Sequence, residues 1–236
     1  LDKHAVEVRL NTSASAEQLA DFDDVVLATG VRPRELSLPG ADHPKVLTYA
    51  EAIATPARVG HKVAIIGAGG IGFDVAELLV TQETTALDLA AWCDEWGVDL
   101  SVSQRGGLKT PAPPKVSREV TMLQRKTSKP GKLLGKTTGW VHRASLKQHG
   151  VEMLAGCEYV KIDDDGLHIR YQEASQTLAV DTVVLCAGQE SVRELLGPLE
   201  RRGVRVHVIG GADEAAELDA KRAIDQGMRL AATLRG

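Results

Sequence analysis

A G-x-G-x-x-G pattern, formed by Gly67, Gly69 and Gly72, lies between an apolar run at 62–66 and a segment with helical apolar spacing at 73–80. In such a strand-to-helix turn the first glycine permits a tight turn, the second lets the backbone approach a pyrophosphate, and the third lets helix pack closely on strand. The helix N-terminus then presents free N–H groups and its positive dipole end to the phosphates. The pattern predicts a dinucleotide-binding turn; the alternative is a glycine-rich turn with only a structural role.

The strand after this helix ends in two cations where NAD-binding folds carry an acid. An NAD site places Asp or Glu about 20 residues after the glycines, whereas this strand ends at Arg125 and Lys126. A guanidinium and an ammonium suit the 2′-phosphate of NADPH. The pair therefore favours NADPH over NADH. The alternative is a solvated basic loop, since Lys129, Lys132 and Lys136 follow.

Two apolar runs that end in glycine indicate a domain built from two chain segments, with another domain inserted between them. Residues 25–30 and 183–188 each end an apolar strand in a small residue and glycine, as buried strands do where they meet a tight loop. Residues 81–118 do not fit a minimal βαβ unit and are interpreted as an insertion with a helix over 88–96. Alternating polarity predicts a short strand over 6–10. The predicted fold class is α/β.

Composition argues against nucleic-acid and membrane partners. The 236-residue chain is 43% hydrophobic with a net charge of −4 and 3% aromatic residues, which does not suit nucleic-acid binding. No apolar run approaches the ~18 residues of a membrane span. Cys93, Cys157 and Cys186 form no C-x-x-C, which excludes a local zinc, iron–sulfur or dithiol site, and reduced cysteines suit the cytoplasm.

Because it starts at Leu1 rather than Met, we expect this chain to be cut from a longer polypeptide.

Other polar residues carry weaker patterns. Asp213 follows Gly211 at the end of a strand, where an acid suits the ribityl hydroxyls of a flavin, although a turn role is equally open. His142 and His149 are seven apart, too far for a metal clamp at i and i+4. Residues 163–165 are interpreted as a turn rather than a calcium loop, because the spaced ligands that should follow are missing.

Six segments together resemble one family, the bacterial NADPH-dependent 2,4-dienoyl-CoA reductases. The resemblance runs from end to end of the chain, and its more specific parts are the G-K-T-T-G-W stretch at 135–140 and the two tryptophans of the insertion. The segments are Thr29-Gly30, Gly67-Ala68-Gly69-Gly70-Ile71-Gly72-Phe73-Asp74, Met122-Leu123-Gln124-Arg125-Lys126, Gly135-Lys136-Thr137-Thr138-Gly139-Trp140, Ala187-Gly188-Gln189-Glu190, and Ile209-Gly210-Gly211 through Leu218-Asp219-Ala220.

The resemblance implies a domain plan and a set of cofactors. It implies a Rossmann-type NADPH-binding domain over 59–187, inserted in a partial FAD-binding α/β domain made of 1–58 and 188–236. In that family a preceding TIM-type barrel holds FMN and a 4Fe-4S cluster and receives the acyl-CoA. Hydride passes from NADPH to FAD, and electrons then reach the FMN singly. This chain shows no barrel and no cluster-binding cysteine run, so its implied share is hydride donation from NADPH to FAD.

The resemblance also implies the binding residues, and it names no acid–base catalyst. Arg125 and Lys126 would hold the 2′-phosphate, beside the glycine turn that includes Gly70. The residues implied for FAD are Ala14, Thr29, Gly30, Trp140, Gly211, Asp213, Arg222 and Ile224. Two alternatives stay open: a reductase of the same architecture that acts on another enone or an amine, and a non-catalytic nucleotide-binding module.

Overall fold

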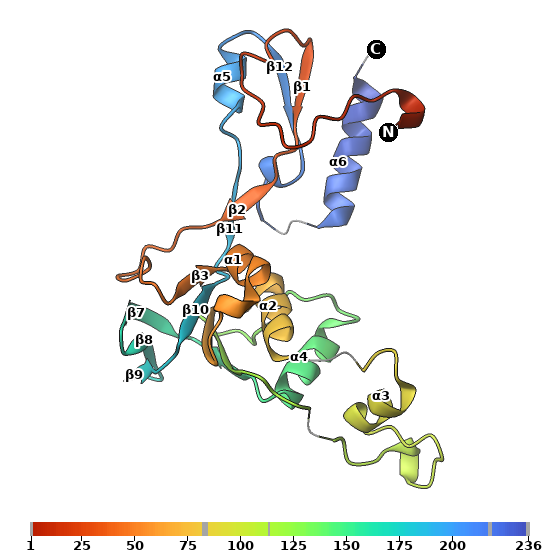
Figure 1. Cartoon of the computed structure of the whole chain (residues 1–236), viewed down its shortest axis with the longest axis vertical. Coiled ribbons are helices and arrows are strands. Elements are labelled where there is room, and N and C mark those ends of the chain that lie inside the picture. The colour runs from red at the N-terminus through yellow and green to blue at the C-terminus, as the bar shows by residue number, and fades with distance from the viewer. Residues whose placement is uncertain (1, 82–84, 113, 217–218, 235–236) are drawn as a thin grey trace. The chain divides into compact units, whose positions relative to one another are not determined.

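The computed structural model describes residues 2–81, 85–112, 114–216 and 219–234 (Figure 1). Backbone contacts divide the chain into two units, Leu1–Arg32 with Gln189–Gly236 and Pro33–Gly188. The first boundary differs from the expected one at 58/59 because strand β3 (Val46–Thr48) pairs with β10 of the second unit. The expected division into domains at 1–58, 59–187 and 188–236 stays a prediction. None of the described helices is long and apolar enough to span a bilayer.

The second unit is built on a five-stranded parallel sheet. The order β3-β10-β4-β5-β6 places the strand before the glycine turn, β4, between β10 and β5. After β4 the chain first forms β5 on one side of it. Only after β6 to β9 does it return to form β10 on the other side, as in a doubly wound fold. The remaining strands of this sheet are β10 (Thr182–Leu185), β4 (Lys62–Ile66), β5 (Glu119–Gln124) and β6 (Glu152–Ala155).

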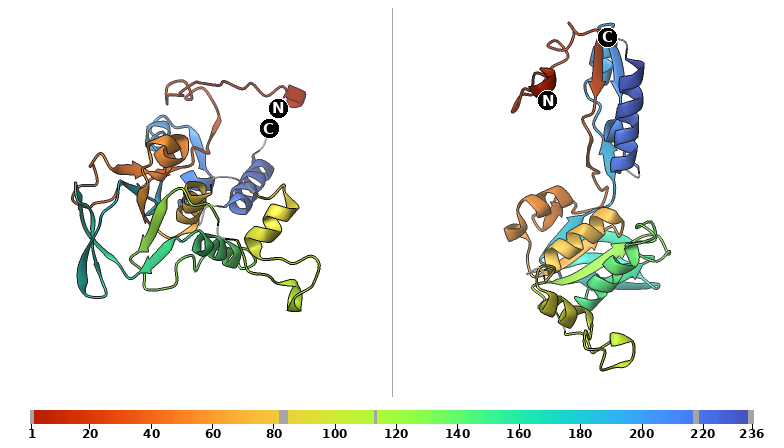
Figure 2. Two further views of the ribbon diagram at one scale, coloured as in Figure 1. Left: turned by 60° about the horizontal axis from the view of Figure 1, so that its bottom comes forward. Right: turned by 90° about the vertical axis from the view of Figure 1, so that its right-hand side faces the viewer.

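Successive residues of β4 point to opposite faces of the sheet and enter two separate cores. Val63 and Ile65 pack with residues of three helices, whereas Ala64 and Ile66 pack with residues of a three-stranded antiparallel sheet. Both faces are thus covered, which explains the continuous apolar run of this strand. Figure 2 gives two further views of the helices and the antiparallel strands that cover the parallel sheet. The helices are α1 (Tyr49–Ala54), α2 (Gly70–Val80) and α4 (Gly139–Gln148), and the strands are β7 (Glu158–Asp163), β8 (Gly166–Tyr171) and β9 (Ala174–Leu178).

The predicted insertion contains the predicted helix, α3 (Leu89–Trp96). Asp88 caps its first turn by accepting a hydrogen bond from the N–H of Ala91 at 3.0 Å, and Gly97 ends it in the left-handed conformation. A short 3-10 turn follows at Arg105–Gly107, and another 3-10 turn, Pro56–Arg58, precedes β4. The described part of the insertion therefore has a helix and a turn of its own.

The first unit has a parallel strand pair, β1 and β12, whose small core contains Val25, Leu27 and Leu199. The strand predicted over 6–10 is wrong: this segment is irregular, and Leu10 is 78% exposed. Its alternation finds no partner strand among the described residues. The elements are 3-10 turns at Asp2–His4 and Gly210–Ala212, strands β1 (Asp24–Leu27), β2 (Val31–Pro33), β11 (Gln189–Ser191) and β12 (Arg205–Val208), and helices α5 (Leu196–Glu200) and α6 (Ala220–Thr233).

Asp181 fixes the start of β4. One carboxylate oxygen accepts hydrogen bonds from the N–H groups of His61, at 3.0 Å, and Lys62, at 2.8 Å. These two bonds and the nearby positive charges lower the pKa of Asp181 below its ordinary value of 3.8. The carboxylate therefore contributes stability above that ordinary value, and the contribution is lost as pH falls through the lower folded-state pKa.

We expect Asp181→Asn to lower the urea midpoint at pH 7 and to leave it less sensitive to acid between pH 4 and 2. Asp164→Asn, which removes the same charge at a hairpin turn, serves as the comparison. Equal acid sensitivity in wild type and Asp181→Asn would contradict this role.

Candidate nucleotide-binding site

A cavity of about 520 Å³ lies in the second unit where the carboxyl ends of β4, β5 and β10 meet. Sheets of this type bind ligands outside the carboxyl ends of their strands, where the chain turns in opposite directions from adjacent strands. The cavity therefore has the position expected of a dinucleotide site. It is lined by Arg34, Gly67, Ala68, Gly69, Gln124, Arg125, Lys126, Ser128, Lys129, Lys132, Leu133, Tyr159, Ala187 and Gly188.

Each glycine of the G-x-G-x-x-G pattern has a separate geometric reason. Gly67 has φ +119°, and a Cβ there would lie 2.4 Å from the carbonyl oxygen of Cys186. A Cβ on Gly72 would lie 2.0 Å from the carbonyl oxygen of Gly67, so only glycine lets α2 pack this closely on the turn. Gly69 lines the cavity, and a Cβ there would meet nothing within 4 Å. The second glycine is thus open to a ligand, as a pyrophosphate requires.

Arg125 and Lys126 follow β5 directly and line the cavity beside the glycine turn. The side chain of Gln124 donates to the carbonyl oxygen of Lys126 at 2.9 Å, and the N–H of Gly156 donates to the same oxygen at 3.0 Å. These bonds fix the backbone that carries the cations. Within the described ranges neither Arg125 nor Lys126 forms an ion pair, so their charge is available to an anion.

The basic stretch after the cation pair folds back over the glycine turn. The N–H of Gly131 donates to the carbonyl oxygen of Ala68 at 3.0 Å, and Arg143 donates to the carbonyl oxygen of Gly131 at 3.0 Å. Lys129 and Lys132 consequently line the same cavity. The structure thereby places two of the three lysines of the expected solvated loop at the candidate site, and Lys136 lies outside it.

Sequence reasoning missed two side chains that come from other parts of the chain. Arg34, from the loop after β2, lies beside Gly188, whose Cβ would be 3.3 Å from the guanidinium carbon. Tyr159, on β7, lines the cavity, and its burial raises the pKa of the phenol, although Arg125 acts in the opposite direction. The hydroxyl therefore stays protonated and can donate a hydrogen bond. No local pattern marks either residue.

The lining fits the phosphates of a dinucleotide. Five of the described lining residues are Lys or Arg, and none of them is Asp or Glu. A site of that charge, placed at the N-terminus of α2, favours several negative charges at once. Gly70 begins α2, and a Cβ on it would also meet nothing within 4 Å. The assignment of these residues to NADPH stays a prediction.

In the first unit, residues implied for FAD lie around two local structures. Gly211 lines a cavity of about 410 Å³ together with Ala28 and Asp219, the N-cap of α6. Thr29 donates through its hydroxyl to the carbonyl oxygen of Val192 at 2.6 Å, and the N–H of Val192 donates to the carbonyl oxygen of Gly30 at 3.0 Å. The strand end and the start of α6 therefore border one open space.

The other residues implied for FAD are less gathered. Asp213 accepts a hydrogen bond from the side chain of Gln226 at 2.8 Å. Arg222 pairs with Glu214 at 3.1 Å, and its buried Nε has no hydrogen-bond partner among the described residues. Ile224 is 65% exposed, and Ala14 is exposed in an irregular segment.

Trp140 belongs to the second unit. It is 62% exposed and does not line the nucleotide cavity. The orphan Nε donor of Arg222, on α6, suits a polar cofactor edge. The flavin roles stay predictions.

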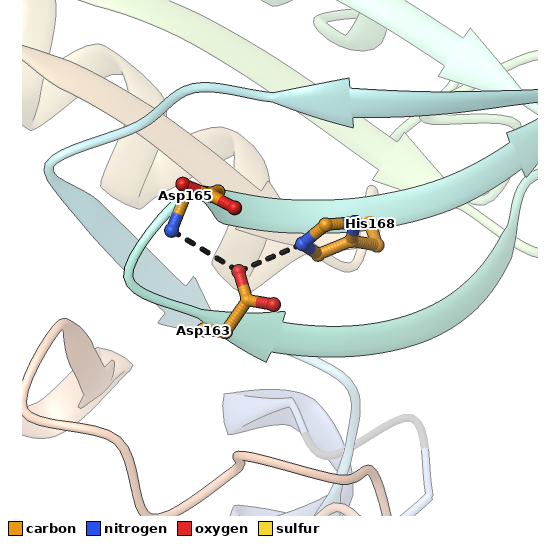
Figure 3. Close-up of side chains that lie close together, drawn as sticks. All are labelled: Asp163, Asp165 and His168. Carbon is orange, nitrogen blue, oxygen red and sulfur yellow. Dashed lines mark hydrogen bonds and ion pairs between the residues drawn. The ribbon is translucent and has the colours of Figure 1, made fainter.

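The predicted turn at 163–165 is confirmed as the connection between β7 and β8 (Figure 3). One carboxylate oxygen of Asp163 accepts from the N–H of Asp165 at 3.1 Å and contacts Nε2 of His168 at 2.7 Å. The other oxygen pairs with Lys161 at 2.6 Å. These contacts satisfy the Asp163 carboxylate and close the hairpin.

The three cysteines are buried free thiols. Burial raises the pKa of Cys186 to about 12 and also raises the pKa of Cys157. Thiols that stay protonated are poor nucleophiles. Cys157 and Cys186 are therefore interpreted as core residues rather than nucleophiles.

Comparison with known proteins gives a family. The model of the pyridine nucleotide-disulphide oxidoreductases matches residues 1–219. The chain is 28% identical over 217 residues to a metal reductase of Desulforamulus reducens, which covers 88% of the chain and 31% of that protein. It is 41% identical over 88 residues to a cinnamate reductase of Clostridium sporogenes, which covers 36% of the chain and 13% of that protein.

Among solved structures, a 2-naphthoyl-CoA reductase complex aligns with a TM-score of 0.77 at 21% identity, over 100% of this chain and 31% of that one. At this identity the likeness shows the fold alone. The chain spans less than a third of the length of each of these three relatives. The family match over nearly all of the chain, the parallel sheet and the glycine turn agree: the chain belongs to the pyridine nucleotide-disulphide oxidoreductase family.

Proposed function

We propose that this chain is the pyridine-nucleotide and flavin part of an NADPH-dependent 2,4-dienoyl-CoA reductase. The observation that carries the proposal is the cavity at the ends of β4, β5 and β10, where Arg125 and Lys126 stand in place of an acid. The family resemblance of the motifs at 67–74, 122–126 and 135–140 supplies the substrate class.

In this proposal the second unit holds NADPH, and the first unit holds FAD. The open face of Gly69 receives the pyrophosphate, and Arg125 with Lys126 receives the 2′-phosphate. Lys129 and Lys132 add positive charge at the same cavity, and Arg34 lies at its β10 side. When bound, NADPH supplies a hydride and FAD accepts it. The protein's task in this proposal is to position the two cofactors.

Reduction of a conjugated substrate is supported by one relative, which is named a cinnamate reductase. Cinnamate carries a double bond conjugated to a carboxyl group. The chain spans under a third of the metal reductase and of the 2-naphthoyl-CoA reductase. In this proposal, as the family resemblance implies, the acyl-CoA contacts a part of the protein outside this chain.

The test is made on the chain together with the sequence that flanks it in its gene. Mixed anaerobically with NADPH or NADH, the protein should lose its oxidised-flavin absorbance much faster with NADPH. Addition of a 2,4-dienoyl-CoA should then restore the absorbance, whereas an amine should not. Flavin reduction by NADPH with reoxidation only by another enone would remove the dienoyl-CoA assignment. A colourless protein that binds NADPH without a redox change would leave a nucleotide-binding module.

A further inference from the structure

A second cavity, of about 500 Å³, lies in the same unit and shares no lining residue with the nucleotide cavity. Its volume is in the range of small-molecule sites. Helix α2 begins at Gly70 beside the nucleotide cavity, and Thr81, directly after its end, lines the second one. A helix of this length spans about 16 Å, so the two cavities lie at opposite ends of α2.

One face of α3 forms a wall of this cavity. Trp92, Glu95 and Trp96 all line it, and residues three and four apart lie on one side of a helix. The backbone carbonyl of Glu95 accepts a hydrogen bond from the side chain of Gln148 on α4, and the hydroxyl of Thr85 donates to the Glu95 carboxylate. Both the backbone and the carboxylate of Glu95 are therefore held by neighbouring side chains.

The Glu95 carboxylate lacks a cation. It is half-buried, and no ion pair involves it within the part of the chain that the structure describes. Its neighbour Asp94 differs, because it pairs with Lys109 at 2.5 Å. Lys115 also lines the cavity but forms no ion pair with Glu95. A half-buried carboxylate beside two indoles gains most from a bound cation, which both the charge and the ring faces attract.

His149 adds a hydrogen-bond acceptor. It is 7% exposed and lines the cavity, and its Nδ1 lies 2.9 Å from the carbonyl oxygen of Ser145. A carbonyl only accepts, so Nδ1 carries a ring proton, and in the neutral imidazole Nε2 then has a lone pair. No described residue forms a hydrogen bond with Nε2. This atom is also not among the fully buried atoms that lack a partner, so it is partly accessible. Because His149 lines the cavity, a donor on a ligand bound there can reach Nε2.

We propose that this cavity binds a small organic cation, an ammonium group attached to an apolar body. Glu95 supplies the opposite charge, Trp92 and Trp96 supply the ring faces, and Nε2 of His149 accepts a hydrogen bond from the ammonium. The inference is independent of the proposed function, because none of these residues lines the nucleotide cavity.

The test compares three ligands of one shape. Benzylamine is cationic near neutral pH, benzyl alcohol is neutral, and benzoate is anionic. Trp140→Phe removes one of the three tryptophans, so that the remaining fluorescence comes from Trp92 and Trp96. We expect saturable quenching with benzylamine, about tenfold weaker binding of benzyl alcohol, and no binding of benzoate. Equal binding of all three ligands, preference for benzoate, or no binding at all would overturn the proposal.

Glu95→Gln keeps the shape of the side chain and removes its charge. In this variant benzylamine should bind about as weakly as benzyl alcohol, a loss of about tenfold. Glu200→Gln removes the same charge from the other unit and should leave binding unchanged. Retained preference for benzylamine in Glu95→Gln would refute the assignment. If circular dichroism shows that Glu95→Gln does not fold, the ligand preference of the Trp140→Phe protein still tests whether the site selects a cation. Trp92→Leu then tests whether benzylamine binds in this cavity, because it should weaken binding there.

Discussion

Arg125→Ala combined with Lys126→Ala should weaken NADPH binding by about 10- to 150-fold while leaving NADH binding almost unchanged. The two cations face the nucleotide cavity without an ion pair among the described residues, so the charge lost on substitution is charge available to the ligand. Charge-assisted hydrogen bonds to a phosphate contribute about 1.5–3 kcal/mol, which gives the expected range at about tenfold per 1.4 kcal/mol. Calorimetry with each nucleotide measures both affinities.

The control is Lys136→Ala combined with Lys147→Ala. This variant removes the same charge from exposed positions of the same unit, outside the cavity. It should bind both nucleotides as the wild type does, because a general field is screened over about 8–10 Å in ordinary buffer. Equal loss in the two variants, or equal affinity of the wild type for NADPH and NADH, would mean that no 2′-phosphate clamp exists at the end of β5.

The position of Arg125 and Lys126 in the cavity was predictable because it depends on local patterns. The apolar run that becomes β4, the glycine turn and the helix after it occur in one continuous segment, and the fold fixes where the next strand must end. The prediction allowed for an insertion between α2 and β5, and the structure confirms that β5 pairs with β4. Arg125 and Lys126 therefore arrive beside Gly67 as expected.

The rest of the cavity depends on contacts that no local pattern encodes. Arg34 and Tyr159 are separated from the glycine turn by 33 and 92 residues, counted from Gly67, and reach it through the sheet order. Lys129 and Lys132 resemble a solvated basic loop in the sequence. They line the cavity only because Gly131, at φ +70°, bonds to the carbonyl oxygen of Ala68. The failed strand over 6–10 has the same origin, since alternation predicts a strand only where a partner exists.

Gly72→Ala should destabilise the second unit by about 1–3 kcal/mol or more, the usual cost of forcing extra atoms into a packed core. The added Cβ would lie 2.0 Å from the carbonyl oxygen of Gly67, and a backbone atom cannot move aside as a side chain does. Helix α2 would have to shift away from β4. Urea unfolding should show a lower midpoint for this variant, and NADPH binding should fall with it.

Gly69→Ala separates binding from stability. A Cβ at this position meets nothing within 4 Å, and the backbone is extended at φ −90°, which alanine adopts freely. The free energy of unfolding, measured with urea, should therefore stay within about 0.5 kcal/mol of the wild-type value. NADPH and NADH should both bind about tenfold more weakly, equivalent to ~1.4 kcal/mol, because the methyl group would stand where the pyrophosphate approaches.

Gly227→Ala, on α6, is the matched control, since its Cβ also meets nothing within 4 Å and it lies outside the nucleotide cavity. It should bind both nucleotides as the wild type does. If Gly69→Ala is stable and binds NADPH unchanged, the pyrophosphate does not lie on the glycine turn. The loss in Arg125→Ala with Lys126→Ala would then report a general anion site. If both variants lose NADPH and only Gly69→Ala loses NADH as well, the two ends of the dinucleotide are placed independently: pyrophosphate on the turn, 2′-phosphate at the end of β5.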